Sequence, residues 1–139
     1  MEKATKTIEK ILEDNNLKNT KGHFNVLSVL IKEKHPLSVE NVGKKISIKI
    51  NTTTLYRILD KLSKKGIIYQ TTFLDGKTYY EYQKHHHHHI TCTKCGIKNK
   101  VDFCVSKEIE KINIKKAGFV EINDHVLEFF GVCKKCQKK

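Results

Sequence analysis

Four of the five cysteines fall into two Cys-x-x-Cys pairs, and this pattern restricts the fold more than any other sequence feature. The pairs are Cys92 with Cys95 and Cys133 with Cys136. Two residues between thiolates let both sulfurs of a turn face one ion, and two such turns complete a tetrahedral four-thiolate zinc shell. Such a shell leaves no open position for a substrate. We therefore interpret the zinc as a structural support for a domain too small to stand alone.

The composition indicates a basic protein that is neither secreted nor embedded in a membrane. The chain has 139 residues and a formal net charge of +12 at pH 7. No apolar run approaches the roughly 18 residues of a membrane span, and the N-terminus lacks a secretory signal pattern. We therefore expect a cytoplasmic location, where cysteines serve as metal ligands or thiols. The charge favours a phosphate backbone or anionic lipid as partner, although a lysine-rich composition can simply maintain solubility.

The first half of the sequence has the pattern of several helices followed by a β-hairpin. A short first helix ends near Asn15-Asn16, and Thr20 and Ser38 are expected N-caps of the next two helices. Apolar periodicity predicts a further helix over residues 52–65, with Gly66 at its end. Two strands over residues 67–73 and 77–82, joined through Asp75-Gly76, complete the half.

This order is typical of a winged helix-turn-helix domain, in which the helix before the hairpin enters the DNA major groove. That helix carries Arg57, the only arginine of the sequence, whose planar fork reads guanine or grips phosphate as lysine cannot. An ordinary amphipathic helix with a polar solvent face is the alternative. The side chains expected to contact double-stranded DNA are Thr52, Thr53, Thr54, Tyr56, Arg57 and Lys61.

The second half has a different character, with short strands and a single helix. Strands are expected over residues 88–92, 100–103, 119–122 and 126–132, and a helix over 106–117 closed by Gly118. The fold class is therefore α+β, with one domain over residues 1–84 and a second over 85–139. Cys104, beside Phe103, is interpreted as a small buried apolar side chain rather than a ligand.

Residues 85–89 are five consecutive histidines. The run is internal, which argues against an expression tag, but a loose solvated tract remains an alternative. If it leads into the strand ending at Cys92, alternation places His87 and His89 on one face and His86 and His88 on the other. The run then serves two sites, although imidazoles with nearby carboxylates suit Fe²⁺, Zn²⁺, Mn²⁺ or Co²⁺ alike.

Taken together and in order, these segments resemble the ferric uptake regulator (Fur) family of metal-dependent bacterial repressors. The resemblance lies between Thr20 and Cys136. It is carried by residues 53–59 (Thr-Thr-Leu-Tyr-Arg-Ile-Leu), 80–82 (Tyr-Glu-Tyr), the histidine run into 90–96, Gly118-Phe119, and 125–133.

The resemblance implies an N-terminal winged helix-turn-helix domain followed by a small α/β dimerisation domain with a four-cysteine structural zinc site. It also implies a regulatory ion between the two domains. By motif matching, the sensing ligands fall on His35, Glu81, His87, His89 and Asp102. A further metal site of some members falls on His86, His88, Glu108 and His125.

The function implied is a homodimeric, metal-responsive repressor that binds operator DNA. We expect Fe²⁺ sensing and control of metal-uptake genes, with a peroxide-sensing or zinc-uptake regulator of the same family as alternatives. A His-rich metal buffer or metallochaperone is the rival from another class, and it leaves the winged-helix order unexplained. An enzyme is not expected, because the four-cysteine shell is closed and the histidines lack a convincing nucleophile.

Overall fold

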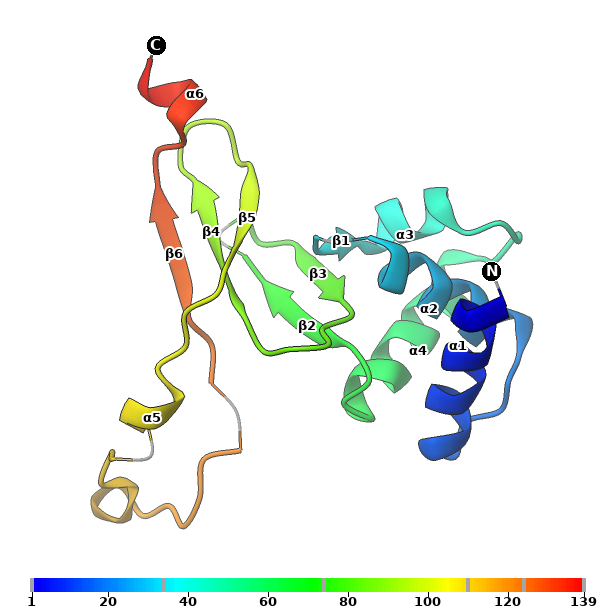
Figure 1. Ribbon diagram of the computed structural model, residues 1–139, viewed down its shortest axis with the longest axis horizontal. Helices are drawn as coiled ribbons and strands as arrows, with labels where there is room; N and C mark the ends of the chain where they lie inside the picture. The colour runs from blue at the N-terminus through cyan, green and yellow to red at the C-terminus, as the bar shows by residue number, and fades with distance from the viewer. Residues whose placement is uncertain (1, 34, 74, 110, 124, 139) are drawn as a thin grey trace. The chain divides into compact units, whose positions relative to one another are not determined.

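The computed structural model describes residues 2–33, 35–73, 75–109, 111–123 and 125–138. The chain divides into two compact units, Met1–Lys84 and His85–Lys139 (Figure 1). Within the described residues, no helix is long and apolar enough to cross a membrane.

The first unit is mainly helical, and three of its described helices begin after a capping residue. It contains the helices α1 (Glu2–Asp14), α2 (Lys21–Lys32), α3 (Val39–Lys45) and α4 (Thr52–Lys64). The side chains of Thr20, Ser38 and Asn51 each accept a hydrogen bond from a backbone N–H in the first turn of the helix that follows. The caps expected at Thr20 and Ser38 are confirmed. Gly66, just beyond α4, has φ 70°, a conformation that favours glycine.

Apolar side chains from all four helices form the core of the first unit. Leu12 of α1, Leu27 of α2, Val42 of α3 and Leu59 of α4 are all buried in one cluster. The polar faces of these helices consequently remain on the surface, as the apolar periodicity predicts.

A small sheet follows α4 and completes the winged helix-turn-helix unit. The strands β2 (Tyr69–Thr72) and β3 (Thr78–Glu81) form the expected antiparallel hairpin, with Gly76 at φ 73° in the turn. The strand β1 (Leu37–Ser38) pairs with β3 on its other side, so the order is β1-β3-β2. The sequence did not predict β1, because two residues before a helix carry no readable alternation.

The second unit is built on a three-stranded sheet of order β5-β4-β6 (Figure 1). The central strand β4 (His88–Cys92) is antiparallel to β5 (Lys98–Val101) and parallel to β6 (Glu128–Gly131). Short helical turns, α5 (Ser106–Ile109), the 3₁₀ turn η1 (Ile114–Ala117) and α6 (Lys134–Gln137), lie outside the sheet. The mixture of helices and sheets in the two units confirms the α+β class.

Two expectations for the second unit are wrong. The helix expected over residues 106–117 consists of α5 and η1, with no helix at residues 111–113, and position 110 lies outside the described residues. No strand forms at residues 119–122. The apolar side chains Ile112, Phe119 and Val120 are exposed, so this segment lacks the packed surface that stabilises a helix or strand of marginal propensity. The strands β5 and β6 are also displaced or shorter than expected.

Candidate metal centres and DNA-contacting helix

The four paired cysteines meet where β4 ends and α6 begins. The sulfur atoms of Cys92, Cys95, Cys133 and Cys136 all lie within 4.8 Å of one another. In a tetrahedral site with Zn–S bonds of about 2.3 Å, two sulfurs lie about 3.8 Å apart. The Sγ atoms of Cys95 and Cys133 are 3.8 Å apart, so this cluster fits the structural zinc ion.

Backbone hydrogen bonds hold the two cysteine turns together. The N–H of Thr93 donates to the carbonyl oxygen of Gly131 at 2.8 Å, which joins the ends of β4 and β6. The N–H of Cys133 donates to Sγ of Cys92 at 3.4 Å, and this bond is the main reason that the pKa of Cys92 is lowered to about 6. Hydrogen bonding with Cys133 raises the pKa of Cys136 to about 12. A zinc ion binds the ionised form of cysteine, so metal binding at this cluster releases thiol protons.

The histidine run enters β4 with the alternation that the sequence predicts. The rings of His87 and His89 have centroids 4.9 Å apart, and the rings of His86 and His88 have centroids 4.7 Å apart. His88 and His89 are buried in the central strand. The last two histidines of the run therefore belong to β4, and the ring contacts pair His87 with His89 and His86 with His88.

The other residues matched to the sensing ligands lie in both units. Glu81, at the end of β3, is buried and accepts a hydrogen bond from Nε2 of Gln83 at 2.8 Å. His35 is exposed in the same unit, with Nε2 3.5 Å from the carboxylate of Glu33. In the second unit, a hydrogen bond from Lys100 lowers the pKa of the exposed Asp102, and the charge of His87 contributes to that shift. Asp102 therefore lies within electrostatic reach of His87.

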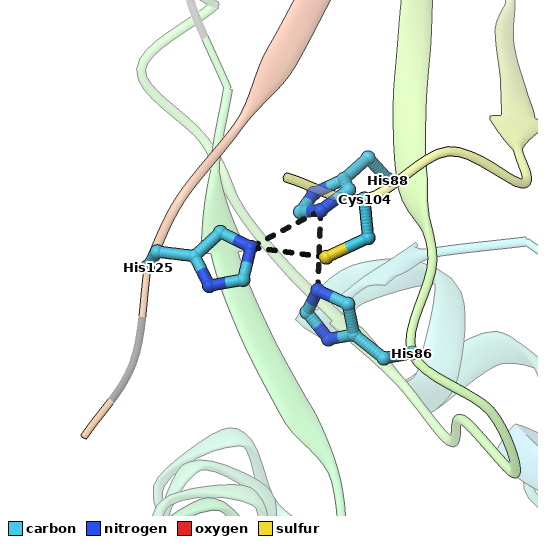
Figure 2. Close-up of side chains that lie close together, drawn as sticks. All are labelled: His86, His88, Cys104 and His125. Carbon is cyan, nitrogen blue, oxygen red and sulfur yellow. Dashed lines mark hydrogen bonds between the residues drawn. The ribbon is translucent and has the colours of Figure 1, made fainter. Parts of the chain in front are cut away.

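The opposite face of the histidine run belongs to a second cluster, shown in Figure 2. His86, His88, Cys104 and His125 offer ligand atoms that all lie within 4.8 Å of one another. Burial lowers the pKa of His88, and the neighbouring rings of His86 and His125 lower it further. These shifts favour the neutral imidazole, which is the form that binds a metal.

Two observations about this second cluster differ from the sequence interpretation. Glu108, matched by resemblance to the family's further site, is an exposed residue of α5 and is not a member of the four-residue group. Cys104, interpreted as an apolar core residue, is only half-buried, and its Sγ lies 3.5 Å from Nε2 of His125. The signal in the sequence was that Cys104 is the one cysteine outside the two pairs.

The helix α4 presents a polar face to solvent. Leu55, Ile58, Leu59 and Leu62 are buried on its inner side. The six side chains expected to contact DNA are all exposed on α4: Thr52, Thr53, Thr54, Tyr56, Arg57 and Lys61. The helix therefore combines a buried anchoring face with an exposed face of hydroxyl, phenol and cationic groups.

Comparison with known proteins places these features in one family. Residues 14–130 match the profile of the ferric uptake regulator family. The ferric uptake regulation protein of Staphylococcus epidermidis is 35% identical over 94% of this chain and 94% of its own length. The corresponding protein of Neisseria gonorrhoeae is 36% identical over 92% of each chain.

Solved structures agree with this result. The Helicobacter pylori ferric uptake regulator, a protein with three functional metal binding sites, has a TM-score of 0.71 at 26% identity and covers 99% of this chain and 94% of its own. A zinc uptake regulator solved with zinc and DNA has the same fold, with a TM-score of 0.72 at 20% identity, and covers 99% of this chain and 95% of its own.

Proposed function

This chain belongs to the ferric uptake regulator family of metal-responsive transcriptional repressors, and on that premise we propose that it senses Fe²⁺ and represses metal-uptake genes. Family membership makes it a homodimer that binds operator DNA, with a structural zinc ion and a separate regulatory metal. We propose further that it acts in the cytoplasm and has no enzymatic activity.

The pair His87 and His89 is the observation that carries the proposed regulatory site. The centroids of the two rings are 4.9 Å apart. His87 directly precedes β4, and His89 is buried within that strand. Glu81 belongs to the first unit and lies six residues before His87 in the sequence, and we assign its carboxylate as a further ligand. We assign His35 and Asp102 as further ligands.

These ligands come from both units, and this distribution provides the switch. His87, His89 and Asp102 belong to the second unit, whereas His35 and Glu81 belong to the first. Ligands from two units can share one ion only in some of the arrangements that the units adopt. Metal binding therefore shifts the population toward those arrangements. In the dimer, such a shift sets the spacing of the two α4 helices, so that both reach half-sites on the same DNA.

The exposed face of α4 is the proposed DNA-reading surface. Arg57 provides the fork suited to guanine O6 and N7, and Thr52, Thr53, Thr54, Tyr56 and Lys61 provide contacts to phosphates and bases. The net charge of +12 supports binding to the phosphate backbone.

We propose iron because of the relatives of this chain, since the ligand types alone do not select one ion. The assigned ligands are imidazoles and carboxylates without a thiolate, a donor set that suits Fe²⁺ as well as Mn²⁺ and Zn²⁺. The characterised relatives at 35% and 36% identity are ferric uptake regulation proteins. A peroxide-sensing or zinc-uptake regulator remains the alternative within the family.

The test is a metal titration of DNA binding. Protein that retains its structural zinc is treated with chelator, and then Fe²⁺ (without air), Mn²⁺ or Zn²⁺ is added with DNA selected by the protein from a random pool. We expect Fe²⁺ to increase sequence-selective, salt-sensitive retention at the lowest free concentration. Stronger activation by Zn²⁺ would reassign the signal, and metal binding with no effect on DNA retention would support a metal buffer instead.

A further inference from the structure

The family resemblance already matches His86, His88 and His125, together with Glu108, to a further metal site. We propose that in this chain Cys104 takes the place of Glu108 as the fourth ligand, which makes the site a thiolate-containing second zinc site. The site is separate from the four-cysteine cluster and from the pair His87 and His89. It does not rest on the regulatory role proposed above, because it lies entirely within the second unit.

The distances within this cluster agree with a tetrahedral zinc ion. With Zn–N bonds of about 2.0–2.1 Å and a Zn–S bond of about 2.3 Å, two nitrogens lie about 3.3 Å apart and a nitrogen and a sulfur about 3.6 Å apart. The Nε2 atoms of His86 and His88 are 3.1 Å apart, and those of His88 and His125 are 3.2 Å apart. The Sγ atom of Cys104 lies 3.5 Å from Nε2 of His125. Figure 2 shows the four side chains pointing toward one another.

The four ligands come from three separate stretches of the chain. His88 is the first residue of β4 and His86 lies two residues before it. Cys104 lies between β5 and α5, and His125 lies shortly before β6. An ion held by all four would fasten the segment 102–127 to the central strand. Among the described residues of that segment, the apolar side chains of Ile112, Phe119, Val120 and Val126 are exposed and contribute little packing.

The donor set determines which metal the site takes. Three neutral imidazoles and one thiolate favour zinc, whereas carboxylates suit Mn²⁺ and similar hard ions. Binding of Zn²⁺ displaces the thiol proton of Cys104 to solvent, which leaves a net charge of +1 on the ion and its ligands. Four protein ligands fill a tetrahedral shell, so the site is suited to holding the segment rather than to catalysis. The second zinc site therefore differs from the imidazole and carboxylate set around His87 in its preference among metals.

Cobalt provides a direct test, because a thiolate ligand gives Co²⁺ a charge-transfer absorption that imidazole ligands do not. Protein verified to retain the four-cysteine zinc is titrated with Co²⁺ without air. We expect a charge-transfer band with the intensity of a single thiolate, together with the visible bands of tetrahedral Co²⁺. Added Zn²⁺ should remove these bands by competition, whereas Mn²⁺ should not.

Matched variants assign the band to Cys104. Cys104→Ser should abolish it and lower Zn²⁺ affinity at this site by at least about tenfold, since even changes behind the first shell of ligands cost 10–100-fold. Cys104→Asp should retain Co²⁺ binding without the band and gain Mn²⁺ competition. The double variant His87→Ala/His89→Ala should keep the band, which separates this site from the regulatory one.

Two results would overturn the proposal: a charge-transfer band that persists in Cys104→Ser, or wild-type protein that binds Co²⁺ without one. If Cys104→Ser fails to fold, alkylation of wild-type protein decides the question. Zn²⁺ should protect Cys104 from iodoacetamide and Mn²⁺ should not. Equal labelling of Cys104 with and without Zn²⁺ would contradict the assignment.

Discussion

His23 is a buried histidine of the first unit, with 8% of its surface exposed and Nδ1 2.8 Å from the hydroxyl oxygen of Thr20. Burial lowers its pKa below 6.5, and the charge of Lys61 lowers it further. The folded protein thus binds this proton less tightly than the unfolded chain does. The resulting stabilisation is present above pH 6.5 and is lost as the pH falls through the folded-state pKa.

We predict that His23→Gln reduces the loss of stability on acidification below pH 6.5. The measurement is urea unfolding at several pH values, in the presence of chelator so that metal does not compete with protons. Asn19→Gln offers a control, because it changes an exposed residue without an ionisable group between α1 and α2 and should retain the wild-type pH dependence. The same acid-side slope in His23→Gln and wild type would show that His23 contributes nothing to it.

Arg57 tests whether α4 reads DNA through a guanidinium fork or only through charge. Arg57→Lys keeps the charge. It should weaken the free energy of binding to the selected DNA sequence by about 1–3 kcal/mol, while the salt dependence of binding stays unchanged. Arg57→Ala should also reduce the salt slope by about one. Fluorescence anisotropy at several salt concentrations measures both quantities. Wild-type DNA affinity in Arg57→Lys would mean that the guanidinium group of Arg57 does not read a base.

At the scale of elements, the first unit could be predicted almost entirely from the sequence. Apolar periodicity predicts its helices, together with local signals such as the N-cap at Thr20 and the glycine at position 66. The segment 106–122 could not be predicted in the same way. Its apolar residues Ile112 and Phe119 have helical or strand spacing, yet they remain exposed and no element of the described chain packs on them sufficiently.

One face of the helix α4 packs in the core of the first unit, and the opposite face is exposed to solvent. Leu59 is 0% exposed, whereas Tyr56 is 52% exposed. We predict that Leu59→Ala lowers the free energy of unfolding by about 2–5 kcal/mol, through lost burial and a residual cavity. The control Tyr56→Ala should change it by no more than about 0.5 kcal/mol and should weaken DNA binding instead. Chemical denaturation of both variants checks this, and equal losses would contradict the division of faces.

Metal ligands could be predicted from the sequence where a short spacing along the chain fixes their relative positions. Two residues between cysteines identify the structural zinc ligands, and strand alternation places His87 with His89 and His86 with His88. The approach of Cys104 to His125 could not be read in this way, because both residues lie in irregular segments where no periodicity relates sequence to direction.

At the scale of the whole molecule, the described residues of the second unit do not form a conventional core. Among its described residues, Cys92 is the only buried side chain of the apolar class. Exposed apolar side chains are available to a second copy of the chain, including those of Ile97, Phe119, Phe130 and Val132. Zinc binding and dimerisation must therefore supply the stability that packing within one chain does not.

We predict that Cys136→Ser removes one zinc ion per chain and dissociates the dimer, while the helical first unit still unfolds cooperatively. Metal analysis, sedimentation and circular dichroism measure these three properties. The control Lys135→Ala changes an exposed residue of the same turn and should leave all of them unchanged. A Cys136→Ser protein that lost this one zinc ion and remained dimeric would show that the four-cysteine zinc is dispensable for assembly.

The regulatory role of His87 and His89 is tested most directly by DNA affinity of the double variant His87→Ala/His89→Ala, measured by anisotropy with and without Fe²⁺ in the absence of air. Wild-type affinity for selected DNA should rise with Fe²⁺ by roughly 5–150-fold, the usual range of coupling between two binding sites. The variant, with zinc content and dimerisation verified, should show the metal-free affinity under both conditions. An undiminished response to Fe²⁺ in the variant would place the metal sensor elsewhere in the molecule.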